Sequence, residues 1–163
     1  MADKKARCWE CIAYPESMIK NWEEEIYSLF QLPFAYCIHD KDVDGKGEKR
    51  KIHVHIILVF PNTTTYKHAL AVFQQLGEIS NCKSCINVRW CYDYLIHDTE
   101  DSKKKHKYLY SKEERICGTS CSSSDIVFVS SSEILSVFPD PESSVDSLEE
   151  SSLVLSVDSV TSS

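Results

Sequence analysis

Two histidines that flank a single valine, His53 and His55, are the most chemically informative feature of the sequence. They lie in the apolar segment 52–60, which predicts a β-strand, and alternate side chains of a strand point to the same face roughly 6.6 Å apart. Both imidazoles could therefore bind one cation. Ile57 and Val59 continue the same face as apolar residues, so two imidazoles without partners would cost several kcal/mol of desolvation. The alternative is a pair of polar residues on the exposed face of an edge strand.

Further ligands for a cation precede this strand. The charged, glycine-containing segment 40–51 predicts a solvated hairpin loop, which would bring His39 beside the start of the histidine strand. One carboxylate among Asp40, Asp42 and Asp44 could then complete a site of nitrogen and oxygen ligands. Such a set suits Mn²⁺ or Mg²⁺ assisting phosphate chemistry, or less often Zn²⁺. Asp-rich turns are also common for turn-forming reasons alone, so spacing by itself leaves the metal site open.

A nucleophile for phosphate chemistry is available in two nearby tyrosines, Tyr92 and Tyr94. They fall at the start of a predicted helix, where residues two apart differ by about 200° in direction, so at most one can face the metal. Tyr94 has His97 three residues on and on the same helix face, whereas Tyr92 has no obvious polar partner there. Tyr94 is therefore the better candidate. The alternative is that both are core or rim aromatics.

Apolar periodicity predicts the elements that position these side chains. They are, in order, a strand at 7–14, a helix at 17–30, a strand at 34–38, the loop at 40–51, a strand at 52–60, a helix capped by Asn62 or Thr63 and ending near Gly77, a strand at 86–88, a helix at 90–98 and a basic, aromatic return segment at 103–110. The hairpin makes at least part of the sheet antiparallel. We therefore expect an α+β fold with helices on the sheet faces and the strand 52–60 at its centre.

The net charge is divided unevenly along the 163 residues. Residues 1–120 hold all 18 bases and 17 acids, whereas residues 121–163 hold 8 acids, no base and 16 serines. We expect this acidic, Ser-rich segment to be disordered. Its short apolar pieces at 126–129 and 153–155 could instead add a strand or self-associate.

Several classes of protein are disfavoured by composition and motif content. No unbroken apolar run is longer than that at 56–60, which is far short of a membrane span, so no membrane association is expected and the cytoplasm is the default location. The sequence has no GxxxxGK[ST] motif, which argues against a nucleotide-driven motor.

Two CxxC pairs, Cys8 with Cys11 and Cys82 with Cys85, raise the possibility of a zinc site. We disfavour it, because residues three apart on an extended segment point to opposite faces and cannot chelate one ion together. Without a secretory signal, free thiols are expected rather than disulfides.

Five motifs, taken in order, resemble the nicking domain of rolling-circle replication initiators of small plasmids from Gram-positive bacteria, a group of the HUH endonuclease superfamily. The similarity covers about residues 5–116. The motifs are Tyr14-Pro15-Glu16-Ser17, Ile38-His39-Asp40-Lys41-Asp42, His53-Val54-His55, Tyr92-Asp93-Tyr94-Leu95-Ile96-His97 and Lys103-Lys104-Lys105-His106.

The resemblance implies a five-stranded antiparallel sheet with flanking helices over 1–118, followed by the acidic tail at 119–163. It implies that a divalent metal, Mn²⁺ or Mg²⁺, is bound by His39, Asp42, His53 and His55. Tyr94 matches the catalytic tyrosine of the family, which leaves Tyr92 as a packing residue. The chain departs from the family after this domain, where plasmid initiators carry a helical oligomerisation domain, so its oligomeric state stays open.

The resemblance also implies an activity: nicking of origin DNA, single-stranded at the nick, to start rolling-circle replication with host helicase and polymerase. The source would be a plasmid, phage or virus, and the location would be nuclear for a eukaryotic virus. Alternatives are an HUH transposase or relaxase, or a non-nicking DNA-binding regulator. Two basic groups could position DNA phosphates. They are Lys46, Lys49, Arg50 and Lys51 on the hairpin, and Lys103, Lys104, Lys105 and Lys107 after the tyrosine helix.

Overall fold

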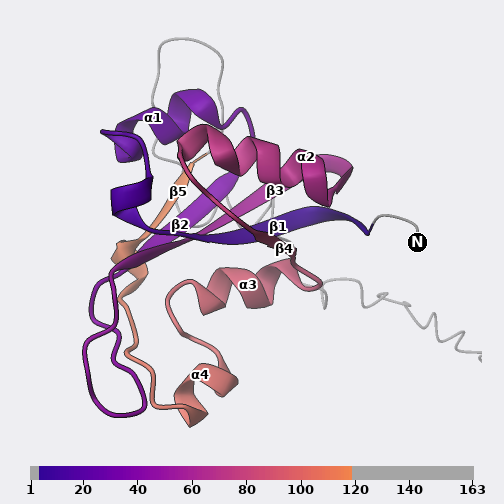
Figure 1. Cartoon of the computed structure of the whole chain (residues 1–163). Helices are drawn as coiled ribbons and strands as arrows, with labels where there is room; N and C mark the ends of the chain where they lie inside the picture. The colour runs from indigo at the N-terminus through magenta and orange to yellow at the C-terminus, as the bar shows by residue number, and fades with distance from the viewer. Residues whose placement is uncertain (1–3, 119–163) are drawn as a thin grey trace, which may run out of the picture.

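A five-stranded antiparallel sheet forms the centre of the molecule, with helices on both of its faces (Figure 1). The computed structural model describes residues 4–118, and the predicted acidic tail lies outside the described residues. The strands are β1 (Lys5–Ala13), β2 (Phe34–His39), β3 (His53–Thr65), β4 (Cys82–Ser84) and β5 (Arg115–Gly118). Their order in the sheet is β4-β1-β3-β2-β5. The α+β fold expected from the sequence is therefore confirmed.

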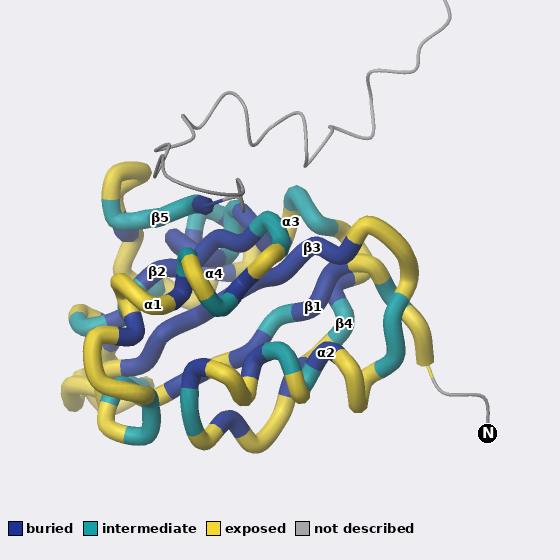
Figure 2. The backbone as a smooth tube through the Cα atoms, turned by 90° about the horizontal axis from the view of Figure 1, so that it is seen from above, coloured by how far each residue is buried: buried dark blue, intermediate teal, exposed yellow. Residues whose placement is uncertain are grey.

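Strand β3 is the central strand, as its apolar sequence predicts. Residues 53–60 are all buried, because helices cover both faces of the sheet at this point. The buried strands appear as the dark centre of Figure 2, and the exposed segments lie around it.

The helices form two layers. On one face lie α1 (Trp22–Leu29) and α2 (Tyr66–Phe73), with the short 3₁₀ turns η1 (Pro15–Ser17) and η2 (Gln74–Leu76). On the other face lie α3 (Val88–Tyr94) and α4 (Glu100–Lys104), and η3 (Lys112–Glu114) leads into β5. None of the helices within residues 4–118 is long and apolar enough to cross a membrane.

Each face of the sheet has its own hydrophobic core. Large aromatic and aliphatic residues such as Phe30, Phe34 and Phe73 fill the core beneath α1 and α2. A smaller core, which includes Tyr92 and Leu95, fixes α3 against the opposite face. The second core matters for function because it places the tyrosine helix beside the histidines of β3.

The first predicted helix begins later than its apolar stripe indicates. Asn21 has a left-handed backbone (φ 58°) and precedes the first helical residue, Trp22. The preceding residues pair with a distant segment instead: Met18 forms a β-bridge with Gly77. Tertiary hydrogen bonds thus replace the first predicted turn of helix.

Two further boundaries differ from the prediction. Strand β3 continues to Thr65, and Thr65 rather than Asn62 or Thr63 caps α2 by accepting a hydrogen bond from the His68 amide. The predicted strand at 86–88 lies instead at 82–84, because Asn87 accepts a hydrogen bond from the Trp90 amide (2.9 Å) and starts α3.

Candidate active site

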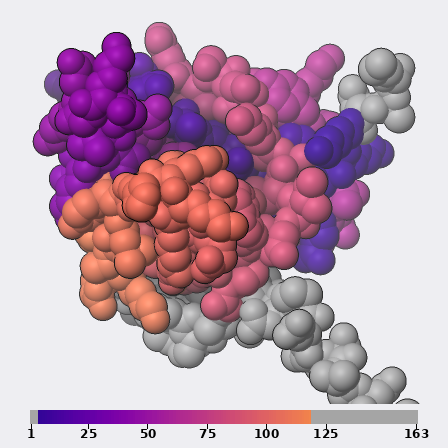
Figure 3. Space-filling model, turned by 90° about the horizontal axis from the view of Figure 1, so that it is seen from below, coloured from indigo at the N-terminus to yellow at the C-terminus, as the bar shows by residue number. Residues whose placement is uncertain are grey.

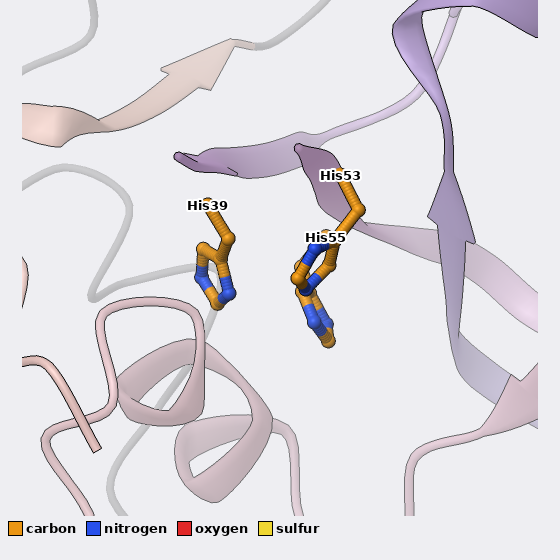
Figure 4. Close-up of side chains that lie close together, drawn as sticks. All are labelled: His39, His53 and His55. Atoms are coloured by element: carbon orange, nitrogen blue, oxygen red, sulfur yellow. The ribbon is translucent and has the colours of Figure 1, made fainter. Parts of the chain in front are cut away.

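The register of the central hairpin places the histidines together. His39 of β2 is the direct cross-strand partner of His53 of β3, and His55 lies two residues along the same face. The centroid of the His39 ring lies 5.1 Å from that of His53 and 4.5 Å from that of His55. The centroids of the His53 and His55 rings are 5.2 Å apart. Figure 4 shows the three imidazoles extending to the same side of the two strands.

Backbone carbonyls determine which ring nitrogen of two histidines is available. His39 Nε2 donates to the Leu95 carbonyl (2.7 Å), which leaves Nδ1 with a lone pair. His53 Nδ1 donates to the Lys51 carbonyl (2.8 Å), which leaves Nε2. His39 Nδ1 is buried and has no hydrogen-bond partner among residues 4–118. Imidazoles oriented in this way by a carbonyl are typical of metal ligands.

Asp42 is the aspartate of the loop that reaches the histidines. Its Oδ2 lies 3.5 Å from His39 Nδ1 and 3.8 Å from His53 Nε2, and the Tyr110 hydroxyl donates to its Oδ1 (3.0 Å). Asp44 instead accepts hydrogen bonds from backbone amides within the turn. Burial opposes ionisation of Asp42, but the nearby imidazoles and the Tyr110 hydrogen bond outweigh it and lower its pKa below the ordinary value.

His97 is a further member of the cluster that the sequence did not place among the ligands. Its ring lies 4.4 Å from that of His39, and its Nδ1 donates to the Tyr108 carbonyl (2.8 Å). Its Nε2 is buried without a hydrogen-bond partner in the part of the chain that the structure describes. Ligand atoms of His39, Asp42 and His97 also lie close enough together to share an ion. The only sequence signal was its position on the helix face of Tyr94.

Burial favours the neutral form of three of the four histidines. Desolvation lowers the pKa of His53 and lowers that of His55 well below its ordinary value. Desolvation, reinforced by His39, also lowers the pKa of His97 to about 4. Neutral imidazole is the form that coordinates a metal ion, so the donor set of nitrogens with one carboxylate fits a divalent cation.

The two tyrosines lie in different environments. The Tyr94 ring lies 5.7 Å from that of His55 and 5.5 Å from that of His97. Tyr92 is 2% exposed and packs in the core beneath α3, with the Arg115 guanidinium 3.5 Å from its ring centroid. The structure therefore brings Tyr94 to the histidines and turns Tyr92 away from them.

Two hollows flank the cluster. A cleft of about 320 Å³ is bordered by His55, Tyr94 and Tyr14, together with Asn81 and Glu10. A second hollow, of about 510 Å³, also contains Tyr14. Its other lining residues are Ile12, Asp44, Glu48, Lys49, Arg50, Lys51 and His53. A chain of nucleotides crossing from one hollow to the other would pass over the imidazoles.

The two segments that carry the eight basic residues expected to contact DNA, the hairpin loop 40–51 and the segment 103–107, lie on the same side of the sheet as α3 (Figure 1 and Figure 3). Half of these basic residues are already engaged: Lys51 pairs with Glu16, Lys103 with Asp98, Lys105 with Asp101, and Lys107 with the Tyr94 hydroxyl. The other half are exposed and form no ion pair with a residue in the range 4–118: Lys46, Lys49, Arg50 and Lys104. These four remain the best placed to meet phosphates.

Comparison with known proteins gives a match to a family model described as the origin-binding domain of plasmid replication protein, over residues 1–121. The replication protein RepB of Streptococcus agalactiae is 34% identical over 118 residues, which cover 69% of this chain and 56% of the relative. RepB of Lactiplantibacillus plantarum is 31% identical over 112 residues, 64% of this chain and 46% of the relative. A replication protein of Staphylococcus aureus is 25% identical over 114 residues, 70% of this chain and 55% of the relative. The chain thus spans about half the length of these relatives.

Proposed function

The chain belongs to the family of plasmid replication protein origin-binding domains, and from that premise we propose that it nicks plasmid origin DNA by transesterification, with Tyr94 as the nucleophile. The match covers the whole described domain, so the proposal concerns this domain. One observation carries it: the Tyr94 ring lies against His55 and His97, at the end of a cleft that opens beside the imidazole cluster.

The proposed reaction needs no external energy source. The phenolic oxygen of Tyr94 forms a bond to phosphorus, the bond from phosphorus to O3′ breaks, and the phenol loses a proton while the leaving O3′ gains one. The products are a 5′-phosphotyrosine and a free 3′-hydroxyl. Because one phosphodiester replaces another, the strand can be resealed later.

His39, Asp42, His53 and His55 would hold Mn²⁺ or Mg²⁺ in this proposal. Their three nitrogens and one carboxylate, and the orphaned Nδ1 of His39, fit such an ion. When bound, the ion would polarise the scissile phosphate. The protein contributes the position of Tyr94 and the burial that favours neutral imidazoles at His53 and His55.

The DNA would be held as an unpaired strand across the two hollows. Lys49 and Arg50 line the second hollow beside His53, and positive charges there would bind the phosphates next to the scissile one. Asp44 and Glu48 line the same hollow, so the contact would be selective in position rather than uniformly attractive. Host helicase and polymerase are the partners that a free 3′-hydroxyl would require.

Nicking is tested with a supercoiled plasmid that carries its own origin. We expect the protein with Mn²⁺ to relax the plasmid and to form a DNA adduct that survives denaturing electrophoresis. With EDTA, we expect binding without either product. Tight, origin-specific binding with no adduct at any Mn²⁺ or Mg²⁺ concentration would contradict nicking and would leave a DNA-binding regulator.

A further inference from the structure

The fold groups the four cysteines of the two CxxC motifs differently from their order in the sequence. Cys11 of β1 is the cross-strand partner of Cys82 of β4, and both belong to the core beneath α1 and α2. Cys8 and Cys85 belong to the opposite core, together with Cys91 of α3. The two members of each CxxC motif therefore lie on opposite faces of the sheet, as the extended geometry predicted for Cys8 and Cys11, and neither motif chelates as a pair.

Cys8, Cys85 and Cys91 form a thiol cluster that neither CxxC motif by itself indicates. The Cys85 thiol interacts with the thiols of both Cys8 and Cys91, and all three cysteines are free and buried. The backbone amide of Cys85 donates to the Cys8 carbonyl (2.9 Å), which holds the two residues together. Glu10 follows Cys8 on the same face of β1, and its carboxylate, Cys85 Sγ and Cys91 Sγ lie within 4.8 Å of one another.

From this grouping we propose that Cys8, Glu10, Cys85 and Cys91 bind one thiophilic divalent cation, Zn²⁺, in a structural site separate from the histidine cluster. Three sulfurs and one carboxylate oxygen are a tetrahedral donor set that zinc accepts. Ligand atoms around tetrahedral zinc lie roughly 3.5 to 3.8 Å apart. The carboxylate of Glu10 and the sulfurs of Cys85 and Cys91, which lie within 4.8 Å of one another, would therefore contract by about 1 Å, and the Cys8 thiol, which contacts that of Cys85, would complete the set. The site stands independently of the nicking reaction, because it shares no ligand with it.

Burial changes the ionisation of the groups in the cluster. Burial raises the pKa of Glu10, against the opposing pull of Lys83, its cross-strand neighbour. Hydrogen bonding to Cys8 and Cys91, together with burial, likewise raises the pKa of Cys85. A bound cation would stabilise the ionised forms of the carboxyl and thiol groups that coordinate it. Glu10 also borders the open 320 Å³ cleft, which supplies an entry path for the ion.

The proposed ion would fix the tyrosine helix. It would join β1, the β4–α3 connection and α3 at one point, and α3 spans only seven residues, too few to be stable alone. Cys91 lies in the turn of helix that precedes Tyr94. A structural zinc would thus hold the Tyr94 helix against the sheet edge.

Cobalt substitution tests the proposal, because only thiolate ligands give an intense near-ultraviolet charge-transfer band with Co²⁺. The full chain is reduced, freed of metal by chelation and titrated with Co²⁺. Cys121, which lies outside the described residues, is replaced by Ser in every sample. We expect the band to saturate at one Co²⁺ per chain and to bleach when Zn²⁺ is added. Its absence in the reduced protein at saturating Co²⁺ would overturn the proposal.

Matched variants locate the site. We expect Cys91→Ala to lose the band, and Cys37→Ala, which removes a buried thiol of the same core, to keep it. His53→Ala should also keep it, which separates the thiol site from the histidine cluster. A band that persists in Cys91→Ala would refute the assignment.

A second variant covers the case in which Cys91→Ala does not fold. Glu10→Gln leaves the core intact, and we expect it to weaken Co²⁺ affinity at least about tenfold. Loss of a residue that only orients a metal ligand already weakens metal affinity by about this factor. Unchanged affinity would remove Glu10 from the site. The melting temperature is the second readout. We expect a subsaturating concentration of Zn²⁺ to raise the melting temperature of the metal-free wild type but not that of metal-free Glu10→Gln.

Discussion

The side-chain nitrogen of Lys107 lies 2.7 Å from the phenolic oxygen of Tyr94 and donates a hydrogen bond to it. The same nitrogen lies 4.7 Å from the centroid of the Tyr94 ring. Lys107 was assigned to DNA from its place in a basic run, but the structure directs it to the candidate nucleophile. A donor at this distance fixes the direction of the hydroxyl.

Replacement of Lys107 should therefore affect the chemical step. We expect Lys107→Met to slow formation of the covalent adduct about 10- to 100-fold at saturating single-stranded origin DNA, the scale of losing one well-placed donor. Lys104→Met removes the same charge from an exposed site nearby and should change the adduct rate much less. Equal effects of the two substitutions on rate, or an effect on DNA affinity alone, would assign Lys107 to phosphate binding.

The two tyrosines give a direct test of the nucleophile. Tyr94→Phe should abolish the adduct while origin binding persists, because only the attacking oxygen is removed. Tyr92→Phe should keep the adduct and lose at most about 1 kcal/mol of stability, since the core position of the ring is unchanged. Denaturing electrophoresis with labelled DNA measures both, and an inactive Tyr92→Phe with an active Tyr94→Phe would reverse the assignment.

Cation binding to the histidine cluster should stabilise the fold. At a free Mn²⁺ concentration 100 times its Kd, we expect the free energy of unfolding to rise by about 2.7 kcal/mol, reversed by EDTA. His53→Ala should lose most of this gain. His68→Ala changes an exposed histidine on α2, on the opposite face, and should retain it. Thermal melts with and without Mn²⁺ measure this gain. A wild-type melting temperature that does not change with Mn²⁺ or Mg²⁺ would contradict cation binding at the histidine cluster.

Stability without metal should fall as the pH is lowered from about 6.5 to about 4. Between these values an unfolded His97 binds a proton, whereas the folded one, with its pKa lowered to about 4, does not. The unfolded state therefore binds more protons in this window, so acid favours unfolding, by about 2 to 3 kcal/mol for this group. His53 and His55 shift in the same direction.

Urea titrations in EDTA across this pH range measure the slope. His97→Asn should make it shallower, and Asn tolerates the left-handed backbone of this position (φ 60°). His68→Asn, at an exposed position, should leave the slope unchanged. A wild-type free energy of unfolding that does not change between pH 6.5 and 4 would contradict the lowered pKa of His97.

The acidic segment at 121–163, with 8 acids and no base, should compete with DNA for basic surface. Its removal should tighten DNA binding at low salt and have little effect at high salt, because screening weakens the competition. The affinity for DNA of the full chain and of the chain without residues 121–163, measured over a range of salt concentrations, tests this prediction. Identical affinities at low salt would dispose of the idea.

Local patterns in the sequence were sufficient for the hairpin and its histidines. Strict alternation places His53 and His55 on one face, and the charged loop at 40–51 makes the return antiparallel, so the approach of His39 could be predicted without coordinates. The direct pairing of His39 with His53 bears this out. The helix spacing that favoured Tyr94 over Tyr92 also agrees with where the two rings lie.

What only the tertiary structure decided depends on contacts between residues far apart in the chain. Spacing alone left three aspartates open, and the approach of Asp42, the one that the resemblance implied, follows from the loop's path and from Tyr110, 68 residues away. The arrival of Lys107 at Tyr94 and the grouping of Cys85 with Cys8 likewise depend on how whole elements pack. Periodicity reports which face of its own element a side chain takes, but it holds no information on which distant side chain will meet it there.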